Sequence, residues 1–183
     1  MKTARAFTCG GILFALAAFA PGAGAACGGA GDSAADAAQV ATASLSEIRD
    51  RAEKMPIDAR RDIDKRIGIT VERINKEATT KGQAKVAARL AAEFGMTEEA
   101  LLDQKAEHGL SYGELVIAHT LLANSSAGVT LADLVDLRSD LGWGAIAFGL
   151  KFHLEDFEDA IKAEGRVAMG LSKADGKAAV IGK

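Results

Sequence analysis

The chain has little cysteine, proline or aromatic residue, and it lacks an excess of positive charge. Of its 183 residues, two are cysteine and two are proline, 5% are aromatic, and the formal net charge is −3. The length excludes a large multidomain enzyme, and the mild acidity argues against a protein that coats nucleic acid. With 49% hydrophobic and 26% charged residues and so little proline, the composition indicates a folded, helix-rich chain with one modest domain rather than a disordered chain.

The N-terminus has the layout of an export leader. Lys2 and Arg5 precede a mostly apolar run at residues 7–20, and small residues follow at 21–26. A basic start, a short apolar middle and a small-residue exit are typical of a secretory signal peptide, and the run is short of the roughly 20 apolar residues of a membrane-spanning helix. A buried N-terminal helix is the alternative interpretation. We expect residues 1–26 to be a signal peptide and the mature chain to be secreted.

Cys27 is the one cysteine that would remain after the leader is removed, because Cys9 lies within the leader. A lone cysteine cannot form an internal disulfide. Cleavage after Ala25 would leave Cys27 beside a free N-terminus in the periplasm. In the other interpretation, the stretch from Gly24 to Cys27 resembles a bacterial lipoprotein box, which implies lipid attachment at Cys27 and an outer-membrane lipoprotein. Gly24 departs from that pattern, which prefers an aliphatic residue there.

Composition also divides the rest of the chain. Residues 27–43 are almost all small residues or aspartate, and they predict a flexible tether. Residues 44–164 are expected to form a helical domain, and residues 165–183, rich in glycine and lysine, a flexible tail. Loss of residues 1–26 would leave 20 basic against 25 acidic residues, a charge of −5, which further disfavours a role on nucleic acid or as a polybasic membrane-surface protein.

The clearest predicted helix begins at Pro56 or Ile57, after a short first helix that starts near Ser44 or Ser46. Its apolar residues recur three or four apart, which predicts one buried stripe. The opposite face carries opposite charges four residues apart, and we interpret it as a solvated face, with partner binding as the alternative. The stripe is Ile63, Ile67, Val71, Ile74 and Ala78, and the charge pairs are Asp62 with Arg66 and Glu72 with Lys76.

Two segments in the second half of the chain, residues 96–124 and 129–154, repeat one pattern at an initial offset of 33. Each predicts a helix, a glycine-containing turn and a second helix. Thr97 and Thr130 are expected to cap the first helices, and Ser111 opens a capping box. Two units are too few for a solenoid. The predicted fold class is therefore all-α, a compact bundle of seven or eight short helices built partly from two degenerate helix-turn-helix hairpins.

Two more helices follow from the pattern. Residues 115–123 are apolar nearly all round, so we expect this helix at the centre of the bundle. A final helix is predicted at about residues 154–163, ending before Gly165.

The chain contains few residues that indicate chemistry. His119 and His153 lie outside the spacings that put two metal ligands on one helix face, and no phosphate-binding loop or nucleophile motif is present. We predict a protein that is not an enzyme and needs no cofactor. A periplasmic metal- or small-ligand-binding protein that uses His119 or His153 is the alternative. Helix-turn-helix DNA binding comes third, because residues 143–150 lack the basic and amide side chains that read bases and the leader would have to go unused.

Tyr112 and Trp143 are the only tyrosine and the only tryptophan, and each precedes a glycine at matching positions of the repeat. In one interpretation the rings fill helix junctions, and Gly113 and Gly144 let backbones pack closely. In the other, these four residues and Glu114 line a groove for a partner peptide or an apolar ligand.

The aromatic-glycine pattern at residues 142–147, with its counterpart at 112–114, is similar to that of a group of small exported bacterial helical proteins of unassigned function. The resemblance covers about residues 94–154 and implies a helical fold and an envelope location. We therefore expect a non-catalytic envelope protein, an interaction or structural module in the periplasm or anchored to a membrane, with a protein or other envelope partner and no nucleic acid. The oligomeric state stays open.

Overall fold

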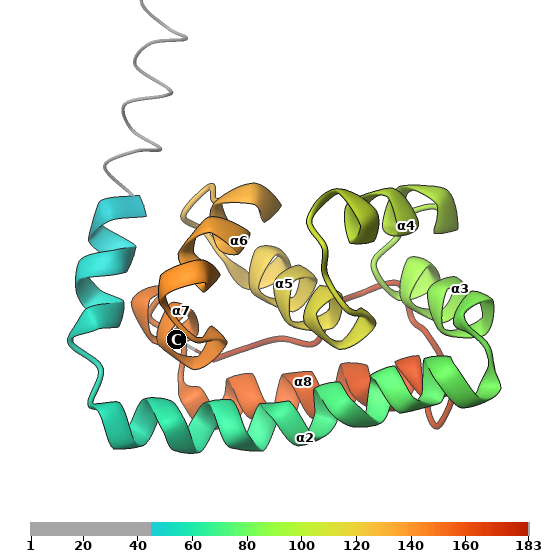
Figure 1. Ribbon diagram of the computed structural model, residues 1–183, viewed down its shortest axis with the longest axis horizontal. Coiled ribbons are helices and arrows are strands. Elements are labelled where there is room, and N and C mark those ends of the chain that lie inside the picture. The colour runs from blue at the N-terminus through green and yellow to red at the C-terminus, as the bar shows by residue number, and fades with distance from the viewer. Residues whose placement is uncertain (1–44, 183) are drawn as a thin grey trace, which may run out of the picture.

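The computed structural model describes residues 45–182, and every regular element in that range is a helix. A first helical segment covers residues 45–53, and seven helices follow it (Figure 1). These eight segments confirm the predicted all-α bundle. The seven are α2 (Ile57–Lys81), α3 (Gln83–Glu93), α4 (Glu98–Glu107), α5 (Tyr112–Asn124), α6 (Leu131–Asp140), α7 (Trp143–Gly149) and α8 (Leu154–Ala168).

Helix α2 is 25 residues long and supports the rest of the bundle. Helix α8 lies alongside it, and the shorter helices pack over this pair (Figure 1). Pro56 is the N-cap of α2, so the predicted start of the helix is confirmed. The predicted stripe is confirmed as well, because its three isoleucines and Ala78 are buried and Val71 is half-buried.

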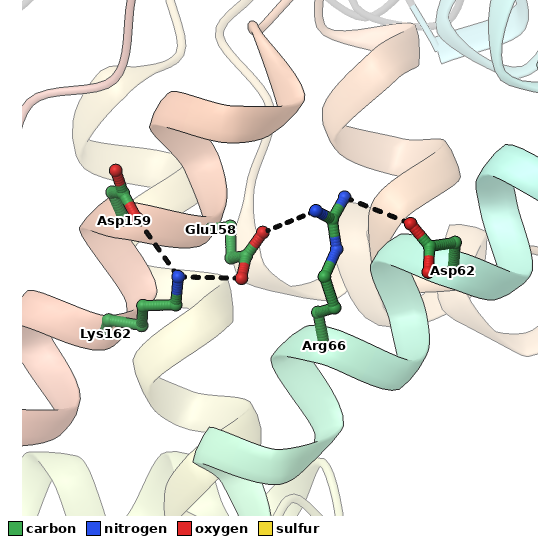
Figure 2. A network of polar contacts seen from close by, with 5 residues as sticks. All are labelled: Asp62, Arg66, Glu158, Asp159 and Lys162. Carbon is green, nitrogen blue, oxygen red and sulfur yellow. Dashed lines mark hydrogen bonds and ion pairs between the residues drawn. The ribbon is translucent and has the colours of Figure 1, made fainter.

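Ion pairs join the charged face of α2 to α8 (Figure 2). Arg66 pairs with Asp62 at 3.4 Å, as the spacing predicts, and also with Glu158 of α8 at 3.2 Å. Lys162 pairs with Glu158 at 2.7 Å and with Asp159 at 3.2 Å. Two cations therefore offset the desolvation of the buried Glu158 carboxylate. Asp62, Arg66, Glu72 and Lys76 are all exposed, as the predicted solvated face requires. The pair between Arg66 and Glu158 shows that one edge of this face also contacts α8.

The helix starts of both repeat units follow the predicted caps. Thr97 accepts a hydrogen bond from the first turn of α4. Ser111 forms a capping box with Glu114 at the start of α5, and Thr130 forms one with Asp133 at the start of α6. Each such cap is worth about 1 kcal/mol, so these local contacts fix the register of three helices.

Helix α5 occupies the centre of the bundle, as its apolar sequence predicts. Residues 115–121 are all buried, and α5 contacts α2, α3, α6 and α8. The buried Thr120 hydroxyl donates to the Val116 carbonyl oxygen at 2.7 Å, so this polar group is satisfied within the helix.

Helix α8 is longer than the sequence predicts, because it continues through Gly165 to Ala168. At Gly165 the helix approaches α2 closely, because an added Cβ would lie 2.6 Å from Cγ2 of Thr70. The glycine therefore permits close packing of α8 against α2 and does not end the helix.

Residues 171–182, which we call the C-terminal strap, pack back over the bundle and differ from the predicted flexible tail. The Asp175 N–H donates to the Glu93 carboxylate at 2.9 Å, and the Ile181 N–H donates to the side-chain oxygen of Asn124 at 2.9 Å. Ile181 itself is buried. Composition does not reveal these contacts, because backbone N–H groups of the strap make them.

Candidate functional site

The predicted aromatic-glycine pairs lie at two junctions with α2. Tyr112 and Trp143 are the first residues of α5 and α7, and their side chains are 4% and 8% exposed. The next residue of each helix, Gly113 or Gly144, donates its backbone N–H to a side-chain oxygen of α2. The two repeat units therefore dock on α2 through the same position of their second helix.

One face of α2 provides both acceptors. Asn75 Oδ1 accepts from the Gly113 N–H at 3.1 Å, and Asp64 Oδ1 accepts from the Gly144 N–H at 2.8 Å. Asn75 and Asp64 are about three helical turns apart, so they lie on the same face. An added Cβ at Gly113 would lie 2.7 Å from the α2 backbone, and one at Gly144 would collide with an α2 side chain. Close packing against α2 thus explains both glycines.

Burial raises the pKa of the Asp64 carboxyl, whereas the hydrogen bond from Gly144 and the charge of Arg60 lower it. The carboxylate faces the N-terminus of α7, where the helix dipole favours a negative charge. Asp64 is therefore an interhelical cap for α7.

A cavity of about 260 Å³ beside the second junction is lined by Glu114 and Trp143 together with residues of α2. Arg138 forms an ion pair with Glu114, and its guanidinium carbon lies 5.7 Å from the centre of the Trp143 ring. Tyr112 is at the other junction, with the Lys105 ammonium 5.3 Å from its ring centre. The structure thus brings Glu114 and Trp143 together without Tyr112, around a space smaller than the roughly 300–1,000 Å³ of most ligand sites.

The two candidate metal ligands line different cavities. His119 is buried in α5, where its Nε2 lies 2.8 Å from Gln104 Oε1 and its ring stacks on Phe94. Burial lowers the pKa of His119. His153 is the exposed N-cap residue of α8. Within residues 45–182, no three His, Cys, Asp or Glu side chains are grouped to hold a metal ion, and the predicted lipid-attachment residue Cys27 lies outside the described residues.

A surface that sequence reasoning missed surrounds Phe148 at the end of α7. Phe148 is 37% exposed, although large aromatic side chains are usually buried. Two cavities of about 430 and 470 Å³ meet there and share Phe148, Phe152 and His153 as lining residues. We call all the residues that line these cavities the Phe148 face: Arg51, Lys54, Phe148, Lys151, Phe152, His153, Leu154, Glu155 and Asp156.

Charge divides the Phe148 face into two rims. Arg51, Lys54 and Lys151 line the first cavity and form the basic rim, whereas Glu155 and Asp156 line the second and form the acidic rim. The two lysines and the two acidic residues are exposed. None of these four forms an ion pair with another residue of the described range. Both rims therefore present charged side chains that no ion pair of the described range compensates, beside the exposed Phe148 ring.

The turn that carries Lys151 ends α7 in a Schellman motif. The Lys151 N–H donates to the Phe148 carbonyl oxygen at 2.9 Å, and the Phe152 N–H donates to that of Ala147 at 3.0 Å. Lys151 has a φ of 66° and is the one non-glycine residue of the described range with a positive φ. Glycine usually occupies this position, and another L-residue there costs about 1–2 kcal/mol. The basic rim thus includes a lysine with a strained backbone.

Arg51 fixes the first helical segment to α7. Its Nε donates to the Gly149 carbonyl oxygen at 2.7 Å, and its guanidinium pairs with Glu47 at 3.5 Å. Gly149 allows this approach, because an added Cβ would lie 2.5 Å from the Ile48 carbonyl oxygen. The basic rim is therefore built on a contact between elements that are far apart in sequence.

Comparison with protein-family models, with curated proteins and with solved structures finds no match to this chain. Within residues 45–182, no helix combines the length and the apolar character that crossing a membrane requires.

Proposed function

We propose that this chain is a non-catalytic interaction module of the bacterial envelope and that it docks a protein partner through the Phe148 face. The observation that carries the proposal is the exposed Phe148 side chain between a basic and an acidic rim. Protein interfaces combine an apolar, often aromatic centre with a polar rim in this way.

The strain at Lys151 supports the proposal. Strained backbone conformations gather at functional sites, where the side chain is needed despite its cost. Five other described residues with φ between 62° and 74° are all glycine. A lysine in the same conformation lowers the stability of the fold. A functional need for its positive charge on the basic rim would explain why lysine rather than glycine occupies the position.

The two rims define the chemistry of the partner. Lys54 and Lys151 are complementary to acidic groups of a partner, and Glu155 and Asp156 are complementary to basic groups. Phe148 and Phe152 line both cavities, so an apolar side chain of the partner fits between the two rims. We therefore infer a protein surface on which an apolar group separates an acidic patch from a basic one. Such electrostatic complementarity selects partners and orients them.

The predicted leader places the module outside the cytoplasm, either free in the periplasm or held to a membrane through lipid at Cys27. The predicted tether, residues 27–43, would let an anchored domain reach a partner at some distance from the membrane.

Photocrosslinking tests the docking surface in cells. Phe148 is replaced by a photoreactive phenylalanine analogue in the full chain with its own leader, and Leu102 on α4, which is 42% exposed, is the matched control. We expect a light-dependent protein adduct at position 148, absent at position 102 and reduced when Lys54 and Lys151 are both changed to Glu. Adducts that are absent at position 148, or equal at both positions, would contradict the proposal.

A further inference from the structure

The Phe148 face itself combines an apolar centre with one basic and one acidic rim, which are the features proposed above for its partner. The identity of the protein that docks there is inferred from this match and rests on the proposed function. The basic rim comes from the end of the first helical segment and from the turn after α7, and the acidic rim comes from the first turn of α8. Phe148, Phe152 and His153 line both cavities and so separate the rims.

A surface with opposite charges on the two sides of an apolar ridge is complementary to itself. If a two-fold axis lies in the interface and runs along the line between the two rims, the basic rim of one copy faces the acidic rim of the other, and the same contact occurs twice. The two Phe148 rings then meet at the axis and exclude water from each other. We propose that the Phe148 face binds the Phe148 face of a second copy of this chain, forming a symmetric dimer.

The exposure and charge of the rim residues support this pairing. Lys54, Lys151, Glu155 and Asp156 are all exposed and lack ion-pair partners in the described range, so pairing across the axis breaks no ion pair recorded there. Each copy supplies two basic and two acidic side chains of this kind, and the third cation of the basic rim, Arg51, pairs with Glu47 of its own chain. The charges available for pairing across the axis are therefore equal in number. Because the pairs are at the rim, they set orientation and are weakened by salt, while the apolar centre provides most of the affinity.

Charge reversal with mixing tests the dimer by sedimentation equilibrium of the purified full chain. One variant carries Lys54→Glu and Lys151→Glu, which makes both rims acidic, and the other carries Glu155→Lys and Asp156→Lys, which makes both basic. We expect a dimer of the unchanged chain, and dissociation constants raised at least about tenfold in each variant alone. An equimolar mixture of the variants should associate again, because every rim then faces an opposite one.

A third variant, Phe148→Ser, should also be monomeric, and circular dichroism verifies that each variant is folded. A monomeric unchanged chain, variants that dimerise as before, or a mixture that stays monomeric would overturn the dimer. Failure of the dimer is distinguishable from failure of the proposed function. If position 148 crosslinks to a different protein in cells, the docking surface stands and a second copy is the wrong partner. If no adduct of any kind forms at position 148, both the dimer and the docking surface are overturned.

Discussion

Glu164 makes the stability of this protein depend on pH in a direction opposite to that of most acidic residues. Its side chain is 1% exposed, and its Oε1 accepts the Ala179 N–H of the C-terminal strap. Its Oε2 has no hydrogen-bond partner among the described residues. The pKa of Glu164 is raised to about 7, chiefly by burial and also by the neighbouring carboxylates of Glu93 and Asp175, while the hydrogen bond from the Ala179 N–H opposes the shift.

The sign of the effect follows from proton binding. Below about pH 4.5 the carboxyl is neutral in both the folded and the unfolded chain. As the pH rises from 4.5 to 7, the unfolded chain releases this proton and the folded chain keeps it, so the free energy of unfolding falls. Above pH 7 the loss is complete. The pKa difference between 4.5 and about 7 corresponds to roughly 3 kcal/mol, at about 1.4 kcal/mol per pH unit.

Glu164→Gln removes the charge and keeps an oxygen that can accept the Ala179 N–H. We expect the variant to be up to about 3 kcal/mol more stable than the unchanged chain at pH 8 and nearly equal to it at pH 4. Urea unfolding followed by circular dichroism across this pH range measures the difference. The exposed Glu107→Gln on α4 is the control and should follow the unchanged chain. If the Glu164→Gln curve also runs parallel to that of the unchanged chain, the buried carboxylate does not govern the pH dependence.

Three further changes test other parts of the structure by thermal or urea unfolding. Gly144→Ala should lower stability by about 1–3 kcal/mol, because its Cβ collides with Ile63. Gly68→Ala, in the middle of α2, is the control and should raise stability by about 0.5–1 kcal/mol, because its Cβ meets nothing within 4 Å. Equal effects of the two substitutions would contradict the close docking of α7. Lys151→Gly should raise stability by about 1 kcal/mol while weakening association, and a loss of stability would show that the turn is not strained. Ile181→Ser should cost roughly 2 kcal/mol and speed tryptic cleavage at Lys173 and Lys177, so unchanged cleavage would argue against a docked strap.

The local features of the fold could be predicted from the sequence because they depend on neighbours in the chain. The caps at Thr97, Ser111 and Thr130 each involve residues three positions apart. The buried stripe of α2 follows from apolar residues that recur every three or four positions. The equivalence of Tyr112 and Trp143 was visible as a repeat. What the repeat could not show is that Asn75 and Asp64 of a distant helix accept hydrogen bonds from the following glycines.

The features that the sequence did not predict depend on contacts between distant residues. Phe148 belongs to a seven-residue helix that is apolar nearly all round, so no periodicity distinguishes its exposed side from its buried one. The basic rim depends on the hydrogen bond from Arg51 to Gly149 of α7, 98 residues later. The glycine at position 165 suggested the end of the last helix, but it allows α8 to pack closely against α2. The composition of the strap suggested a flexible tail, but Glu93 and Asn124 hold it to the bundle.

Backbone hydrogen exchange over a dilution series is the most direct measurement of docking at the Phe148 face. We predict that amides of residues 51–54 and 148–156 exchange more slowly as the concentration of the chain rises, while those of α4, on another part of the bundle, do not change. Exchange at the Phe148 face that is independent of concentration, or a slowing that appears on α4 instead, would contradict this prediction.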